Sequence, residues 1–312
     1  MVTEDICFLA SMPTLPKHIC VCVCTFRRPQ LLGRLLKALL EQDTKGLFTY
    51  SIIIVDNDYA RSAEVVVSEI AAISPVHIGY CVEPQQNIAR ARNRAMANSE
   101  GDFVALIDDD EFPMSDWLVT LFRICAEYEV DGVLGPVKSH FDEQPPKWVV
   151  RGGFYERPIH PTGALVTWQK ARTGNALIKR GLVAGDPEPF RPAFRAGEDQ
   201  DFFRRQIENG RVFIWSAEAI VYEVIPPLRW QRSYMLRKAL LRGATASLQP
   251  DCGAISITKS VIAATVYTAA LPVALMLGQH RFMSLIVRLC DHLGKLLQFV
   301  GINPIQAEYV TE

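Results

Sequence analysis

Three consecutive aspartates, Asp108 to Asp110, directly follow the apolar run 103–107. A run of about five apolar residues bounded by turn signals predicts a buried strand, so the carboxylates are expected at a strand end. Like charges there repel one another and are costly to desolvate, and a divalent cation such as Mg²⁺ or Mn²⁺ would offset that cost. The alternative is a solvated acidic turn that caps a helix beginning near Ser115.

A second acidic group lies in the segment Gly197-Glu198-Asp199-Gln200-Asp201, which opens a predicted helix. Negative charge is favoured at a helix N-terminus, so capping explains part of this group. Capping does not explain why Glu198 and Asp199 are adjacent. A carboxylate placed within hydrogen-bond reach of a hydroxyl acts as a general base, which is the functional interpretation of the pair.

The first half of the chain alternates apolar runs with amphipathic segments. This pattern predicts a mostly parallel sheet covered by helices on both faces, with ligands bound at the carboxyl ends of the strands. Thr25, Asp56 and Asp108 lie at such ends and are expected to converge on one crevice. The predicted strands are 19–25, 51–55, 76–82, 103–107 and 132–137, and the predicted helices are 29–40, 61–72, 87–98 and 116–129.

The second half divides into three kinds of sequence. Residues 144–161 are rich in proline, glycine and aromatic residues, which predicts a long loop over the cleft. All charged residues in 229–242 are basic. The apolar stretch 261–278 would reach about 27 Å as a helix, near the thickness of a bilayer's hydrocarbon core. We therefore predict a tail at 1–17, a sheet domain at 18–226, and a helical region at 227–312 that contacts a membrane.

Two features of the C-terminal region leave its membrane topology open. The stretch 282–300 is amphipathic, and Pro272 interrupts an apolar segment of marginal length. The region is consistent with either a single span or a helix lying in the membrane plane.

Composition excludes some classes of function. The 312 residues carry a formal net charge of −1, so no global field favours nucleic acid as a partner. None of the eight cysteines forms a C-x-x-C pair, and Cys20, Cys22 and Cys24 share one face of a predicted strand. They are interpreted as reduced core thiols of a cytosolic compartment. No basic segment precedes the first apolar stretch, so we expect no cleaved secretory signal.

Six short segments, in order along the chain, resemble the family-2 nucleotide-sugar glycosyltransferases with the GT-A fold, and among them the bacterial exopolysaccharide transferases of the succinoglycan type. Each segment alone is a weak signal, but six in order on an alternating strand and helix pattern form a strong one. The resemblance implies an α/β fold of the GT-A, Rossmann-like kind, with a C-terminal helical membrane-associated segment. The segments are Val-Cys-Thr-Phe-Arg-Arg-Pro at 23–29, Ile-Val-Asp-Asn-Asp at 54–58, Asn-Ile-Ala-Arg-Ala-Arg-Asn at 87–93, the aspartates 108–110, Arg-Thr-Gly-Asn at 172–175 and Gly-Glu-Asp-Gln-Asp at 197–201.

The resemblance implies a set of donor-binding residues. Arginines at positions i and i+2 of a helix cannot face the same way, so one of Arg90 and Arg92 is expected to point outward. The implied residues are Thr25 and Arg27 against the nucleotide, Asp56 on the uracil or ribose, Arg90 and Asn93 at the nucleotide site, and Gly174 and Asn175 around the donor sugar.

The resemblance also implies the metal site and the catalytic pair. Asp108 and Asp110 would hold Mg²⁺ or Mn²⁺ against the donor diphosphate, with Asp109 pointing away. Asp199 would be the general base, and Glu198 would orient it or the acceptor. Many relatives place a metal-binding histidine where this chain has Glu223, which either replaces that ligand or pairs with Arg229.

These roles predict an inverting glycosyltransferase of surface or exopolysaccharide synthesis. It would move a sugar from a nucleotide donor, expected to be UDP-linked, to a lipid-linked or polysaccharide acceptor at the cytoplasmic face of the cell membrane. One alternative is a polyprenyl-phosphate sugar synthase, whose phosphate acceptor is already ionised and needs no base. Two others are a metal-dependent nucleotidyltransferase and a non-catalytic protein that binds sugar nucleotides.

Overall fold

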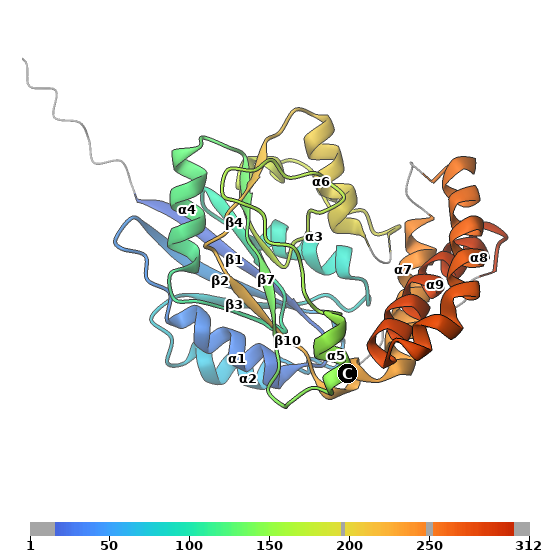
Figure 1. Ribbon diagram of the computed structural model, residues 1–312. Helices are drawn as coiled ribbons and strands as arrows, with labels where there is room; N and C mark the ends of the chain where they lie inside the picture. Colours follow the sequence, from blue (N-terminus) through green and yellow to red (C-terminus); the bar gives the residue numbers. More distant parts are fainter. Residues whose placement is uncertain (1–15, 195–196, 248–251, 303–312) are drawn as a thin grey trace, which may run out of the picture.

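A seven-stranded sheet forms the centre of the structure, a computed structural model that describes residues 16–194, 197–247 and 252–302 (Figure 1). Its strand order is β3-β2-β1-β4-β8-β6-β9, and only β8 runs antiparallel to its neighbours. The predicted mostly parallel sheet is confirmed. The strands are β1 (Lys17–Thr25), β2 (Phe48–Asp56), β3 (Ile78–Val82), β4 (Phe103–Ile107), β6 (Gly132–Leu134), β8 (Asn175–Lys179) and β9 (Phe213–Trp215).

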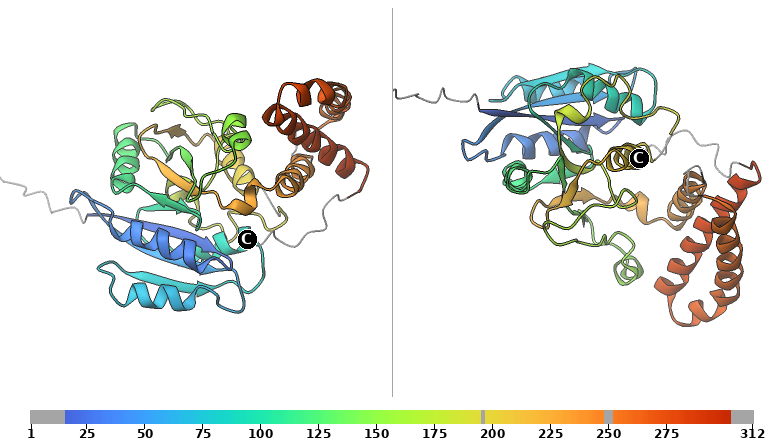
Figure 2. Two further views of the ribbon diagram at one scale, coloured as in Figure 1. Left: turned by 60° about the horizontal axis from the view of Figure 1, so that its bottom comes forward. Right: turned by 90° about the horizontal axis from the view of Figure 1, so that it is seen from above.

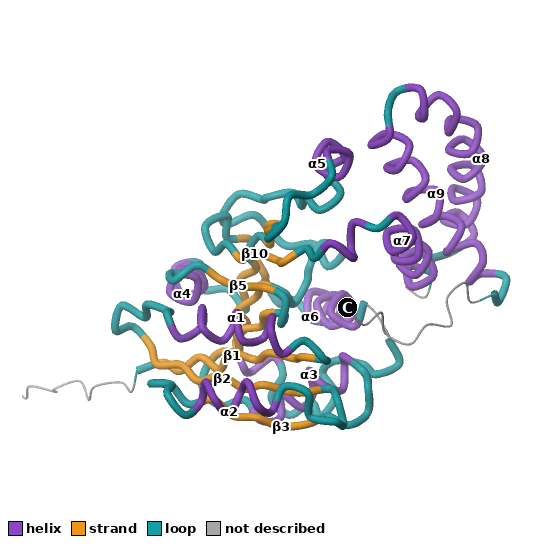
Figure 3. The backbone as a smooth tube through the Cα atoms, turned by 90° about the horizontal axis from the view of Figure 1, so that it is seen from below, coloured by secondary structure: helices purple, strands orange, loops and turns teal. Residues whose placement is uncertain are grey.

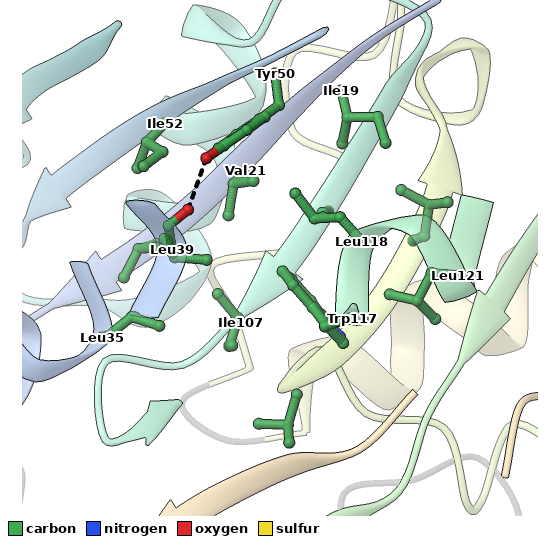
Figure 4. Packing of buried hydrophobic residues seen from close by; sticks show 14 of the residues in the cluster. Ile19, Val21, Leu35, Leu39, Tyr50, Ile52, Ile107, Trp117, Leu118 and Leu121 are labelled. Carbon is green, nitrogen blue, oxygen red and sulfur yellow. Dashed lines mark hydrogen bonds between the residues drawn. The ribbon is translucent and has the colours of Figure 1, made fainter. Parts of the chain in front are cut away.

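Helices cover both faces of this sheet, because alternate residues of its strands enter two separate apolar clusters. Helices α1 (Pro29–Leu40), α2 (Glu64–Ala71) and α4 (Trp117–Glu127) pack on one face, while α3 (Ile88–Asn98) and α6 (Glu198–Glu208) pack on the other. Figure 4 shows part of the first cluster, where the Tyr50 hydroxyl donates to the Leu39 carbonyl oxygen over 2.8 Å.

The cysteines of β1 belong to the second cluster. Cys20 and Cys22 are buried there, and every cysteine in the described part of the chain is a free thiol. They pack as small apolar side chains beneath α3, as the alternation of β1 predicts.

A second sheet of three short strands lies beside the acidic triplet. It has the order β5-β10-β7, with β5 at Glu111–Pro113, β7 at Val137–His140 and β10 at Val221–Val224. The single strand predicted at 132–137 is wrong in its extent, because β6 ends at Leu134 and the chain crosses to β7. Pro136 has no N–H to donate to a ladder, which favours a break at this point.

The segment predicted as a long loop contains the short helix α5 (Lys147–Gly152), which ends at Gly153 with a φ of 58°. Its Val149 packs with Ile225 and Trp230, and the side chains of Trp148 and Tyr155 surround them. These aromatic residues therefore form a small core of their own.

Three long helices form an arm at one end of the molecule (Figures 1 and 2). They are α7 (Arg232–Ala246), α8 (Ala254–Met276) and α9 (Gln279–Phe299), and they follow the short 3-10 helix η2 (Pro227–Trp230). Helix α9 packs against α7, α8 and α5 (Figure 3). Arg242 of α7 and Asp291 of α9 form a two-pronged ion pair with distances of 2.8 and 2.6 Å.

We predict that Gly243→Ala destabilises the contact between α7 and α9. A Cβ atom at Gly243 would lie 1.9 Å from the Asp291 carbonyl oxygen, so the helices would have to separate. Overpacking of this kind costs about 1–3 kcal/mol, against a gain of about 1 kcal/mol in helix propensity. Urea unfolding followed by circular dichroism should show a net loss of stability. Gly181→Ala, where nothing lies within 4 Å of the added atom, is the control and should change stability by less than about 0.5 kcal/mol.

Candidate active site

The acidic triplet lies at the carboxyl end of β4, where the Asp108 side chain is 46% exposed. The register of β4 with β8 pairs Ile107 with Asn175, which brings Gly174 beside Asp108. A Cβ atom at Gly174 would lie 2.6 Å from Glu111 Oε1 and 3.2 Å from Asp108 Oδ2. Glycine is therefore required here because the space is taken by two carboxylates.

Arg92 connects the acidic triplet to the second acidic group. Its guanidinium is buried, donates to the Glu198 carboxylate, and lies 3.3 Å from Asp108 Oδ1. Burial raises the pKa of the Glu198 carboxyl, although Arg92 opposes this shift. The nearby carboxylates keep Arg92 charged by raising its pKa against the cost of burial. One arginine thus holds α3, the end of β4 and the start of α6 together.

Asp199 follows Glu198 in the first turn of α6, after Gly197 with a φ of 82°. Its side chain is half-buried and accepts a hydrogen bond from the Gln200 amide over 2.7 Å. Asp201, in the same turn, is fully buried and pairs with Arg204 and Arg205. The members of this acidic group therefore have different roles. Asp201 fixes the start of α6 through its ion pairs, whereas Glu198 and Asp199 lie near Asp108.

Arginines surround the remaining predicted metal ligands. Asp110 accepts from Arg229 over 2.6 Å and from Arg28 over 3.3 Å. Glu223 accepts from Arg229 over 2.7 Å and is also bound by Arg157. The pairing of Glu223 with Arg229, which the sequence left as one of two alternatives, is thus present in the structure.

Glu111 is a further carboxylate beside the three predicted metal ligands, and sequence reasoning missed it. It is buried, and its Oε2 accepts from the Asp108 amide over 3.1 Å. Burial raises its pKa well above the usual range, and Asp108, Asp110 and Glu223 add to the effect. The signal was visible in the sequence, because Glu111 directly extends the acidic triplet.

The donor set suits a hard divalent cation in its chemistry. In the part of the chain that the structure describes, no group of three or more histidine, cysteine or acidic side chains is placed to hold a metal ion by itself. Magnesium commonly needs only one or two carboxylates, because substrate phosphates and water complete its shell. Desolvation and the neighbouring Asp110 and Asp199 carboxylates raise the pKa of Asp108, which is the repulsion that a cation would relieve.

The predicted nucleotide residues gather at the ends of β1 and β2, whose register pairs Thr25 with Asp56. Thr25 Oγ1 donates to Asp109 over 2.7 Å, so Asp109 turns toward β1. Asp56 is fully buried and accepts from the amides of Asp58 and Ala63 and from the Tyr80 hydroxyl. The half-exposed Arg27 donates to Asp58 over 3.1 Å. The structure thus brings Thr25, Asp56 and Asp109 together at the ends of β1, β2 and β4, with the side chains of Thr25 and Asp56 buried.

Helix α3 resolves the choice between Arg90 and Arg92. Arg90 is exposed, whereas Arg92 is buried against the acidic groups, so Arg92 is the inward residue. Sequence reasoning placed Arg90 at the nucleotide, since the spacing shows that the two diverge but not which one faces in.

The two predicted asparagines are held by the protein's own groups. Asn93 exchanges hydrogen bonds with the backbone of Phe190, at 2.7 and 2.9 Å. Asn175 accepts from Trp117 Nε1 and donates to the carbonyl oxygens of Pro136 and Ala219. Asn93 therefore ties α3 to the segment at Phe190, and Asn175 ties β8 to α4 and to the segments at Pro136 and Ala219.

Comparison with known proteins identifies the family. The family described as Glycosyl transferase family 2 matches residues 20–181. The chain is 33% identical over 237 residues to the succinoglycan biosynthesis protein ExoM of Rhizobium meliloti (strain 1021), covering 75% of each chain. The chain belongs to glycosyltransferase family 2.

Solved structures agree with the GT-A fold. The mannosyltransferase PcManGT from Pyrobaculum calidifontis, in complex with GDP-Man and Mn²⁺, superposes with a TM-score of 0.60 at 17% identity, covering 91% of this chain and 88% of that one. Residues 1–349 of S. aureus TarS with UDP-GlcNAc give 0.53 at 15% identity, covering 91% and 92%. A longer TarS chain gives 0.52 at 19% identity, and there the match covers 72% of this chain and only 39% of TarS.

We predict that Arg92→Met destabilises the protein chiefly by leaving Glu198 buried without a counter-charge. Removing one member of a buried ion pair costs about 3–5 kcal/mol. Adding Glu198→Gln should recover a large part of that loss, because the uncompensated charge disappears. Urea unfolding of the single variants and of the double variant measures this coupling. Losses that simply add in the double variant would show that the pair is not the source of the effect.

Proposed function

We propose that the protein is an inverting glycosyltransferase that uses a nucleotide sugar, expected to be UDP-linked. The proposal rests most on the contact of Arg92 with both Asp108 and Glu198. This arginine brings the carboxylate proposed to face the donor diphosphate close to the pair Glu198 and Asp199, which is proposed to supply the base. Membership of glycosyltransferase family 2 supports sugar transfer in general. The neighbours solved with UDP-GlcNAc and with GDP-Man support a nucleotide-linked donor.

In the proposed reaction Asp199 takes the proton of the acceptor hydroxyl. The acceptor oxygen then bonds to the anomeric carbon as the bond from that carbon to the diphosphate oxygen breaks, and the nucleoside diphosphate leaves with the electron pair. A single displacement inverts the anomeric centre. Glu198, held by Arg92, keeps the start of α6 and hence Asp199 at the cleft.

Asp108 and Asp110 are the proposed holders of Mg²⁺ or Mn²⁺, with Glu111 and Glu223 beside them. When bound, such a cation neutralises charge on the leaving diphosphate. Asp110 and Glu223 now share Arg229. Arg28 and Arg229 both contact Oδ2 of Asp110, so a cation held at that oxygen would compete with them, and the Arg229 guanidinium would be placed to contact phosphate oxygens.

The donor nucleotide is proposed to lie along the ends of β1 and β2. Thr25 and Asp56 lie buried beneath this surface and fix the strand ends that carry it, while Arg27 and the exposed Arg90 offer positive charge. Gly174, Asn93 and Asn175 keep the cleft open and its walls fixed.

The acceptor is proposed to be lipid-linked or a growing polysaccharide, in surface or exopolysaccharide synthesis at the cytoplasmic face of the membrane. Similarity to a succinoglycan biosynthesis protein supports the pathway class. Helix α8, the one described helix that is long and apolar enough to cross a membrane, supports membrane contact.

One observation favours a second candidate, transfer to a polyprenyl phosphate. Arg28, Arg157 and Arg229 gather around Asp110 and Glu223, and guanidinium groups bind phosphates well. A phosphate acceptor is already ionised, so this reaction needs no general base.

Replacing the proposed base distinguishes the two. Asp199→Asn should lower transfer to a hydroxyl acceptor by about 10²–10⁴-fold, the usual contribution of general base catalysis. Release of nucleoside diphosphate is the measurement, and stabilisation by donor in a thermal-shift assay should remain. Asp116→Asn, an exposed position without a side-chain capping bond, is the control. A variant that retains most of its turnover would favour the phosphate acceptor.

The metal is tested by thermal shift with a panel of nucleotide sugars, with and without Mn²⁺. We predict that one donor stabilises the protein by about 2.7 kcal/mol at 100 times its dissociation constant, and only when Mn²⁺ is present. Removing the metal with a chelator should abolish the shift. In Asp110→Asn the metal-dependent part should be lost. An equal shift without metal would contradict the proposed site.

A further inference from the structure

Helix α8 exposes a long apolar surface at the outer edge of the arm (Figures 1 and 3). Only 17% of its most apolar 18-residue window is buried, so α8 is not a core helix. Lys259 is its one charged residue. Its large apolar side chains that are at least half exposed are Ile255, Val261, Ile262, Val266, Val273, Leu275 and Met276.

The opposite face of α8 is fixed to α9 by polar contacts. Lys295 Nζ lies 3.1 Å from Ser256 Oγ, and His292 Nδ1 lies 3.2 Å from Ser260 Oγ. The Ser260 side chain is buried between the two helices. α8 therefore has a protein side and a free side that differ in chemistry.

Helix α9 is in turn fixed to the rest of the molecule. Gly294 brings its backbone against the Leu240 carbonyl of α7, and Asp291 binds Arg242. α9 also packs against α5, the short helix within the segment 144–161 that we call the cleft loop. A span by α8 would break its contacts with α9 or draw charged residues such as Arg288 and Lys295 into hydrocarbon, where such residues are costly.

The polar groups on the free side of α8 suit contact with lipid. The hydroxyls of Thr258, Thr265 and Thr268 donate to the carbonyl oxygens four residues earlier, at 3.0, 3.0 and 2.8 Å. These hydroxyl donors therefore need no hydrogen bond to water. Polar groups among lipid acyl chains must be satisfied within the protein in this way.

Positive charge adjoins the apolar surface. Lys259 lies near the start of α8, Arg281 lies in the first turn of α9 just after α8 ends, and Arg288 lies farther along α9, which runs back beside α8; all three are exposed. Cations at the rim of an apolar helix face attract anionic lipid headgroups.

We infer that α8 lies in the plane of an anionic membrane surface, with its free face among the acyl chains and α9 between it and the protein. This rests on the proposed membrane location and decides between its two forms. Because α9 also contacts α5, the docked helix holds the cleft loop at a fixed distance from the lipid. A membrane span and a dimer formed through the same face are the outcomes that would overturn it.

Vesicle flotation tests the apolar face with the full chain. The wild type should float with phosphatidylcholine vesicles containing phosphatidylglycerol, and less with phosphatidylcholine alone. Ile262→Glu with Val266→Glu should reduce flotation at least tenfold. The control is Val65→Glu with Ile73→Glu, on exposed apolar residues of and after α2, which should float as the wild type does. Undiminished flotation of the α8 variant would overturn the inference, as would a dimer in solution that this variant dissociates.

Thiol labelling of membranes from producing cells tests the topology. Native Cys252 precedes α8, and Arg281→Cys in a Cys252→Ser background places a thiol after it. With Cys252→Ser alone as reference, an impermeant maleimide should reach both thiols in inverted vesicles and neither in spheroplasts. Labelling of the two thiols from opposite faces would show a span and overturn the inference. Donor-induced thermal shifts should be unchanged in the α8 variant, which separates this test from the proposed function.

Discussion

The concentration of negative charge at the end of β4 is the constraint on which the cleft depends. Four successive acidic residues, Asp108 to Glu111, leave one strand, and three of them are buried. Burial raises the pKa of Asp109 to about 7, although Arg28 opposes this shift. Such a cluster persists only if cations lie close to it, because unpaired buried carboxylates are strongly destabilising.

The cations come from distant parts of the chain, so their ion pairs hold several separate segments around the acidic cluster. Arg28 precedes α1, Arg92 lies on α3, Arg157 follows α5, and Arg229 lies on η2. Each ion pair fixes the position of the element that carries the arginine. The same carboxylates that suit a metal therefore also hold together the segments that would surround a donor.

The local sequence pattern predicted the longer strands and helices, whereas the short strands and the orientation of site residues depend on long-range packing. The strand 103–107 and the helix 29–40 agree with β4 and α1, because apolar periodicity and Pro29 specify them locally. β5 and β10 are too short to show a period, and they pair with each other although the paired residues lie 108 to 112 positions apart in the sequence. Arg90 and Arg92 show the same limit within the site, since their divergence follows from helix geometry but the inward one is set by Glu198.

The sequence of α8 is compatible with two membrane topologies, a span and a helix in the membrane plane. The helix that packs against it is needed to choose between them. Hydropathy identifies α8 as a candidate membrane span, but Pro272 within the helix means that hydropathy alone does not choose between a span and an in-plane helix. The partner helix favours in-plane docking over a span, because α9 is amphipathic and faces α8 with Lys295 and His292. Because one side of α8 packs against polar and charged side chains of α9, only its other side can contact lipid. The proposed in-plane docking rests on that asymmetry, and it would place the arm in the same membrane as a lipid-linked acceptor.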